Sequence, residues 1–145
     1  MNGIEKVISL WQPWATPFVL GIKLNETRSW ATNYRGRVYI HAAMNKSVDT
    51  IQFTNNITYY KPNHYIDFSR KIINLLFGVI IGYVDIVDCV RAETIRDKMT
   101  AQELSFGDYS DGRWIWICKN HTALETPIPA KGSQGFWNFN IREVK

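Results

Sequence analysis

The sequence predicts an α+β fold that is mainly β, a small β-barrel of five or six strands with two or three flanking helices. Short segments with alternating or β-branched apolar residues recur along the chain, and turn residues separate them. Apolar residues at helical spacing occur in only a few places. The length of 145 residues suits one core, so we expect residues 1–145 to form a single domain.

The first third of the chain predicts a strand, a helix and two further strands. Lys6–Trp11 alternates in strand fashion and stops just before a proline. A helix of roughly two turns is expected over Pro13–Leu20, with Gly21 as its C-terminal stop. Glu26–Trp30 and Arg37–Ala42 are expected to be strands joined as a hairpin or as a corner.

The middle of the chain predicts a helix, the longest strand and a second short helix. Residues 44–63 are polar and mixed, and they predict mostly irregular structure. Tyr65–Phe77 carries an apolar stripe typical of a helix packed on the barrel. Gly78–Val90 is rich in β-branched residues and predicts the longest strand. A short helix opens at Thr100, and an evident turn follows at Gly107–Gly112.

The C-terminal part predicts three extended segments. They are Arg113–Cys118, Pro127–Ala130 and Gly135–Asn140, and a loop of small residues, 131–134, separates the last two. Five or six strands in total favour a small barrel.

Several classes of protein are not expected from this sequence. No apolar run reaches the roughly 18 residues that a membrane span needs, and the N-terminus lacks the pattern of a secretory signal, so we expect a cytoplasmic protein without a membrane partner. Cys89 and Cys118 end apolar runs, where buried thiols are common. His64 and His121 are not at metal-ligand spacing with either cysteine, and we predict no metal site and no cofactor.

Charge and aromatic content give the first indication of a partner. Lys and Arg number 17 against 13 Asp and Glu, a net charge of +4, which favours polyanionic partners, although so small an excess also serves solubility alone. The chain has 6 Trp, 7 Tyr and 7 Phe, and Trp is seldom used for core filling alone. We expect some of these rings to line a groove.

Three charged residues follow the first predicted helix closely. Lys23, Glu26 and Arg28 crowd near its C-terminus, and residues two apart on a strand point to the same face. Lys can donate to a phosphate or a base carbonyl, and Arg can stack on a base or grip phosphate with two bonds. The alternative is a salt-bridge cluster that only holds the corner between helix and strand.

Two side chains beside the first predicted helix offer contacts to a base. Trp11 can stack on it, and Gln12 can hydrogen-bond to its edge. We expect Trp14 to lie in the core, and we expect His41, among apolar neighbours, to be a hydrogen-bonded core histidine.

Two loops offer contacts to phosphate. Tyr34 and Arg35 belong to a basic turn, from which Arg35 can contact phosphate, although a solvated turn arginine is equally ordinary. The loop with Lys131, Ser133 and Gln134 has small residues whose backbone N–H groups can meet an anion, with a plain connecting loop as the alternative.

Several sequence blocks, in order, resemble the ASCH domain, named for its homology to activating signal cointegrator 1. They are SLWQPWA, GIKLNETRSW, YRGRVYIHAA, GYVDIVDCV, WIWICKN and PIPAKGSQGFW. The family signature Gly-x-Lys-x-x-Glu-x-Arg is matched by Gly21, Lys23, Glu26 and Arg28. The resemblance covers nearly the whole chain. It implies a PUA-like β-barrel with a cleft between barrel and helices, proposed to bind RNA or another nucleic acid.

The leading hypothesis is a module that binds nucleic acid, foremost RNA, and holds a short single-stranded or modified segment in a basic cleft. The resemblance also suggests a hydrolase, because one bacterial branch removes acyl groups from N4-acylated cytidine with a Lys, a Thr and a downstream Glu. Lys23 and Glu103 match two of these positions, but Glu26 replaces the Thr. A ribonuclease, to which Tyr34 could contribute, and a protein-interaction module are further alternatives, and the oligomeric state stays open.

Overall fold

The computed structural model describes residues 3–44 and 75–141, which form a mainly β fold of one mixed sheet and a few short helices. The elements in chain order are β1 (Ile4–Leu10), α1 (Ala15–Val19), β2 (Glu26–Arg28), β3 (Gly36–Ala42), β4 (Val79–Arg91), α4 (Ala92–Ile95), the 3-10 helix η2 (Arg96–Lys98), α5 (Ala101–Ser105), β5 (Trp114–Pro129) and β6 (Phe136–Asn140). The predicted mainly β architecture is confirmed.

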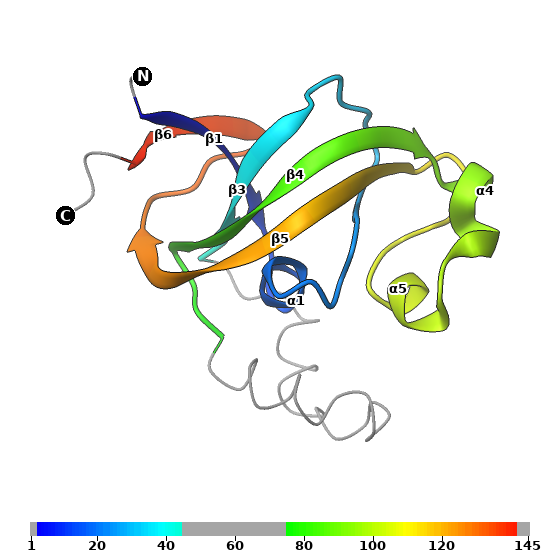
Figure 1. Cartoon of the computed structure of the whole chain (residues 1–145), viewed down its shortest axis with the longest axis horizontal. Helices are drawn as coiled ribbons and strands as arrows, with labels where there is room; N and C mark the ends of the chain where they lie inside the picture. Colours follow the sequence, from blue (N-terminus) through cyan, green and yellow to red (C-terminus); the bar gives the residue numbers. More distant parts are fainter. Residues whose placement is uncertain (1–2, 45–74, 142–145) are drawn as a thin grey trace.

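The sheet has six strands in the order β2-β5-β4-β3-β1-β6. The long strands β4 and β5 run side by side through its middle (Figure 1). β1 and β3 pair in parallel, and the other pairs are antiparallel. β2 pairs with β5 and lies three places from β3, so the alternative of a β2–β3 hairpin is wrong. The segment between them is a connection that crosses the sheet.

β5 differs from its prediction in length. Two separate strands were expected, but Trp114–Pro129 is one strand of 16 residues. Its pairing with β4 shifts register at three places, so the polar stretch between the two predicted strands stays within the sheet. Gly82 lies within this ladder, and a Cβ there would be 2.6 Å from Cβ of Val19. Only glycine lets α1 approach the strand so closely.

The sheet curves around its core until strands from opposite halves meet through aromatic rings. Trp116 on β5 is 1% exposed and stacks on Phe136 of β6, with ring centroids 5.4 Å apart. Trp30, just after β2, contacts Phe136 edge-on at 5.9 Å. Side chains therefore bring the two edges of the sheet together, which gives the fold its barrel-like form.

The helices lie in two places. α1 packs on the middle of the sheet, whereas α4 and α5 lie at one end of it, beyond the ends of β4 and β5 (Figure 1). Thr100 caps α5 by accepting from the N–H of Glu103, at the predicted helix start. α4 and η2 were not predicted. Of the predicted helix Tyr65–Phe77, residues 65–74 lie outside the described part, as do 45–63, and residues 75–77 are not helical.

The helices of the described residues are short. None of them has both the length and the apolar character that crossing a membrane requires.

Candidate functional site

Two adjoining hollows form a groove beside α1 and β2. We call them the inner compartment, of about 560 Å³, and the outer compartment, of about 770 Å³; they share Ser9, Trp11 and Arg28. The inner compartment is further lined by Leu10, Trp14, Lys23, Glu26, Thr27, Ser105, Phe106, Gly107, Asp108 and Arg113. The outer compartment is further lined by Trp30, His41, Ala43, Met44, Lys131, Gly132, Ser133, Gln134 and Gly135.

The end of α1 places Lys23 in the inner compartment. Gly21 has φ +75°, a left-handed conformation that glycine adopts without strain, and it ends the helix as predicted. The chain then folds back, and the N–H groups of Ile22 and Lys23 both donate to the carbonyl of Pro17. This turn directs the Lys23 side chain inward, where it is 2% exposed.

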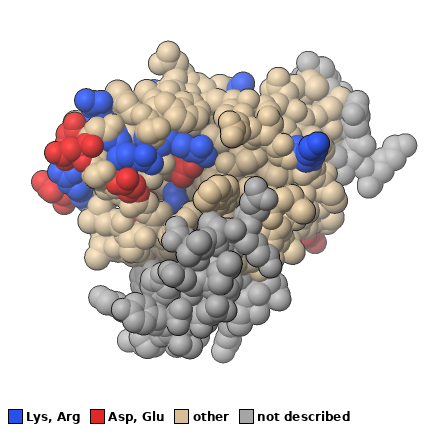
Figure 2. Space-filling model, turned by 180° about the vertical axis from the view of Figure 1, so that it is seen from behind, with Lys and Arg blue, Asp and Glu red and all other residues tan. Residues whose placement is uncertain are grey.

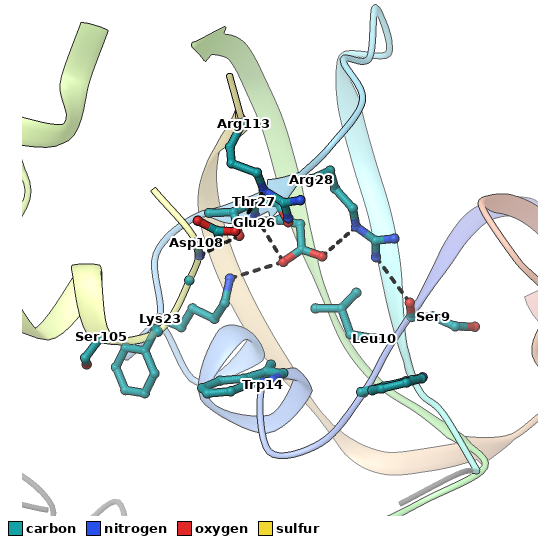
Figure 3. Close-up of a pocket in the computed structure, with 13 residues that line it drawn as sticks. Ser9, Leu10, Trp14, Lys23, Glu26, Thr27, Arg28, Ser105, Asp108 and Arg113 are labelled. Carbon is teal, nitrogen blue, oxygen red and sulfur yellow. Dashed lines mark hydrogen bonds and ion pairs between the residues drawn. The ribbon is translucent and has the colours of Figure 1, made fainter. Parts of the chain in front are cut away.

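Glu26 lies between two cations, as Figure 3 shows. Its Oε1 atom is 3.2 Å from Nζ of Lys23, and its Oε2 atom is 2.9 Å from Nε of Arg28. Burial alone would raise the pKa of the Glu26 carboxyl, but the charges and hydrogen bonds of Lys23 and Arg28 outweigh it and hold this pKa below its usual value. The predicted same-face arrangement of Glu26 and Arg28 is confirmed, and both oxygens of the carboxylate are engaged.

Arg113 and Asp108 complete the charges of the inner compartment. Arg113 donates from Nη2 to the carbonyl of Thr27 over 3.2 Å, and its Nε atom lies 3.6 Å from Oδ2 of Asp108. Sequence reasoning missed both residues, because they reach the groove only through the pairing of β2 with β5. That pairing joins residues far apart in the sequence, such as Arg28 and Trp114, which are 86 positions apart. A local sequence pattern does not predict such a pairing.

Two predicted site residues, Glu103 and Gln12, are buried next to the groove and hold its backbone by hydrogen bonds. Glu103 is 2% exposed and accepts from the N–H groups of Leu24 and Asn25, at 2.7 and 3.1 Å, and from the hydroxyl of Tyr109. Gln12 is fully buried, and its amide bonds to Thr16. Neither lines a compartment, so the structure places Glu103 and Gln12 where they position the chain around Lys23 and Trp11.

The outer compartment presents an exposed ring and positive charge. Trp11 is 57% exposed on the boundary of the two compartments, and Lys131, Ser133 and Gln134 are exposed lining residues of the outer one. Arg28 and Lys131 are its charged lining residues, and within the described part of the chain no carboxylate lines it. Trp14, expected in the core, is instead half-buried and lines the inner compartment.

A chain of partly buried hydrogen bonds supports the 131–134 loop. Trp137 donates from Nε1 to Oγ of Ser9, which lies 3.0 Å from Nδ1 of His41, and Nε2 of His41 lies 2.8 Å from the carbonyl of Ala130. Since a carbonyl only accepts, Nε2 carries the proton and Nδ1 accepts from the Ser9 hydroxyl. Burial lowers the pKa of His41 against the opposing effect of this carbonyl. The expected core histidine is confirmed, and Gly132 lies directly on it.

Two other predicted site residues lie away from the groove. Tyr34 packs against Phe136 and donates to the carbonyl of Arg37 over 2.6 Å. Arg35 lines a separate shallow hollow with acidic neighbours and lies 3.7 Å from Asp88. The structure brings neither residue to Lys23.

The charged surface is mixed. At the end of the molecule that carries α4 and α5, Figure 2 shows basic and acidic side chains side by side, with a largely uncharged surface next to them. The net charge of +4 is therefore not gathered into one positive patch on this face. The charged lining residues of the outer compartment are both cations, whereas the inner compartment contains both signs.

Thiols and histidines have no metal-binding arrangement in the part of the chain that the structure describes. Cys89 and Cys118 are both free, and burial raises the pKa of Cys118 to about 12. His121 is 2.8 Å from the carbonyl of Leu24, and His64 lies outside the described residues.

Comparison with known proteins identifies the family and agrees with the fold. The family model for the ASCH domain matches residues 8–128. Human and mouse activating signal cointegrator 1 are each 30% identical over 143 residues, which is 93% of this chain but 22% of theirs, so the chain spans about a fifth of these relatives. The crystal structure of ASCH from Zymomonas mobilis superposes with a TM-score of 0.56 at 16% identity, covering 96% of this chain and 90% of that one. A tyrosine-to-phenylalanine mutant of that protein gives 0.55 at 17% identity, covering 96% and 92%.

Proposed function

Because the chain belongs to the ASCH domain family, a PUA-like family associated with RNA binding, we propose that it is an RNA-binding module that holds a short single-stranded or modified segment in its groove. The observation that carries the proposal is the outer compartment, where the exposed Trp11 lies with Lys131 and Arg28 and no carboxylate is among the described lining residues. Arg28 is paired through Nε with Glu26 of the inner compartment, so Lys131 supplies the unmatched charge. Cations that follow the backbone and rings that stack on bases are the two components of single-strand recognition.

The position of Trp11 favours an unpaired segment. A ring that is 57% exposed at the junction of two hollows is available for stacking only to a base that has left its own stack. Each compartment has a volume in the range of small-molecule sites, so one or two nucleotides fit rather than a duplex.

The contacts of two carboxylates favour binding over the hydrolase alternative. The Glu26 carboxylate is held by two cations with a lowered pKa, which suits a fixed charge better than a general acid. Glu103, the other residue of that hypothesis, is engaged by two backbone N–H groups and the Tyr109 hydroxyl. Activity on N4-acylated cytidine or on RNA stays an alternative for the assay to decide.

Fluorescence anisotropy with labelled single-stranded RNA tests the proposal. Trp11→Ala should weaken binding by about 1–3 kcal/mol, roughly 5- to 150-fold, because one stacked base loses its platform. Trp11→Phe should retain most of the affinity. Lys131→Ala should weaken binding and make the salt dependence shallower by about one charge, since one phosphate contact is lost.

Two controls make the result specific. Lys119→Ala removes an exposed lysine of β5 that lines neither compartment, and it should leave the affinity unchanged. A gel of the recovered RNA and an incubation with an N4-acylated cytidine show whether anything is cleaved. RNA that binds wild type and Trp11→Ala equally would overturn the proposal, and turnover would favour the hydrolase.

A further inference from the structure

Glu26 occupies the place where two cations converge. A Lys and an Arg on either side of one carboxylate, 3.2 and 2.9 Å away, form the arrangement in which proteins commonly hold a phosphate. The N–H of Thr27 also donates to Oε1 of Glu26, over 3.3 Å. The chain thus supplies its own anion at a position that would otherwise bind one.

The charges of the two compartments therefore differ. In the inner compartment, Lys23, Arg28 and Arg113 are set against the carboxylates of Glu26 and Asp108 (Figure 3). The outer compartment has two cations and no carboxylate among its described lining residues. Arg28 is already paired with Glu26, so Lys131 is the cation of the outer compartment that no carboxylate among the described lining residues matches. An anionic group is attracted to such charge, so phosphate should prefer the outer compartment.

On the basis of the proposed function, we propose that Glu26 is a built-in counter-anion that sets how a nucleotide lies in the groove. It keeps phosphate out of the inner compartment, which takes the uncharged base and ribose. The phosphate is held by Arg28 and Lys131 in the outer compartment. Trp11 lies at the boundary, where the nucleoside and its phosphate meet. Carboxylates such as that of Asp108 can accept from the amino group of a base, a contact that the phosphodiester of a nucleic-acid backbone cannot make because it carries no donor.

Binding of inorganic phosphate tests the role of Glu26 directly. Isothermal titration calorimetry at constant ionic strength compares wild type, Lys131→Ala, Glu26→Gln and the double variant Glu26→Gln with Lys131→Ala. We expect Lys131→Ala to weaken phosphate binding about fivefold, because the outer compartment loses a cation. The double variant should bind phosphate at least about tenfold more tightly than Lys131→Ala alone, since Lys23 and Arg28 lose their internal anion.

A matched control distinguishes the effect of removing the carboxylate of Glu26 from the effect of the change in net charge. Glu125→Gln removes the same charge from an exposed residue of β5 outside both compartments, and it should change phosphate binding by less than about twofold. If circular dichroism shows that Glu26→Gln does not fold, Asp108→Asn in the Lys131→Ala background takes its place. The Asp108 carboxylate is 57% exposed, so we expect a smaller gain in phosphate affinity, about threefold.

Failure of this inference is distinct from failure of the proposed function. Phosphate binding that does not increase when either carboxylate is removed would overturn the counter-anion while RNA binding by wild type stands. A gain in phosphate binding in a protein that binds no RNA would support the counter-anion and overturn the nucleotide arrangement and the proposed function together.

Discussion

Glu26 couples the electrostatics of the groove to the stability of the fold. Its neighbour Lys23 is 2% exposed, and a buried ammonium group is tolerated in a protein when a partner compensates its charge. Lys23 also donates to the backbone carbonyl of Asn25, so the pair holds the turn between α1 and β2. Charge at this position therefore affects folding as well as the electrostatics of the groove.

The lowered pKa of Glu26 predicts a specific pH dependence. Because the folded-state pKa lies below the ordinary value of 4.5, the ionised carboxylate contributes its full stability above that pH and loses it as pH falls through the folded-state pKa. Glu26→Gln should reduce the free energy of unfolding by a constant amount between about pH 6 and 8, and the difference from wild type should shrink below about pH 4.5.

Urea denaturation of both proteins across this range measures the difference. Other acids with lowered pKa values, such as Asp85 and Asp108, are the same in both proteins and cancel. Glu125→Gln serves as the control. A difference that stays constant down to about pH 3 would show that the ion pairs of Glu26 do not stabilise the fold.

Single residues were predictable where the chemistry is local. The shared face of Glu26 and Arg28 follows from the two-residue period of a strand, and it is observed. The burial of Gln12 was not predictable, because its partners include the carbonyl of Leu76, 64 positions along the chain. Arg113 was missed for the same reason, since a distant strand brings it to the groove.

At the scale of elements, the 131–134 loop depends on one glycine. A Cβ on Gly132 would lie 2.6 Å from Cε1 of His41 and 2.8 Å from Oγ of Ser9. Both of these side chains are held by hydrogen bonds, so the loop rather than its support would have to move. The exposed Lys131 and Ser133 would move with it.

Gly132→Ala should therefore weaken RNA binding, by about tenfold if one phosphate contact is lost, while the protein stays folded. Anisotropy gives the affinity, and circular dichroism gives the melting temperature. Gly112→Ala is the control for a glycine substitution, because nothing lies within 4 Å of its added Cβ, although its φ of +86° adds some strain. Unchanged RNA affinity in Gly132→Ala would show that the loop position does not matter.

The elements themselves were largely predictable. The predicted strand Gly78–Val90 is observed as Val79–Arg91, one residue different at each end. The predicted segment Gly135–Asn140 is observed as Phe136–Asn140, one residue shorter at its start. β5 was divided in two because its middle, including Asn120 and Thr122, is polar on a face that solvent reaches. α4 was missed because four residues are too few to show a period.

At the scale of the whole molecule, contacts between aromatic rings hold the two edges of the sheet together. In a complete barrel, backbone hydrogen bonds between the first and last strands do this. Phe136 contacts Trp116, Trp30 and Tyr34, with centroids 5.4 to 5.9 Å apart. This cluster joins β6 at one edge of the sheet to β5 and to the chain that follows β2 at the other.

A double-mutant cycle tests this closure. Phe136→Ala should lower the free energy of unfolding by about 2–3 kcal/mol, somewhat less than for a fully buried Phe. Combined with Trp30→Ala, it should show a coupling of about 0.5–1.5 kcal/mol, because the two rings contact each other. Guanidinium denaturation measures the four proteins of the cycle. Strictly additive losses would mean that the edges do not support one another.

The order of the strands in the sheet could not be predicted from the sequence. Alternation identifies strands but carries no information on which strands pair, and the parallel pairing of β1 with β3 is one of several arrangements that bury the same faces. The family resemblance supplied the barrel-like architecture, while the two-compartment groove required the pairing of β2 with β5.

The antiparallel pairing of β1 with β6 has a practical consequence. Ile4 lies opposite Asn140, so the two ends of the described chain leave the sheet side by side. Ser9 lies five residues along β1, about 16 Å away at the rise of a strand. A fluorophore attached beside Ile4 or beside Asn140 would therefore sit on the same edge of the sheet, at a similar distance from the groove. Data from these two labelling positions should then be interchangeable.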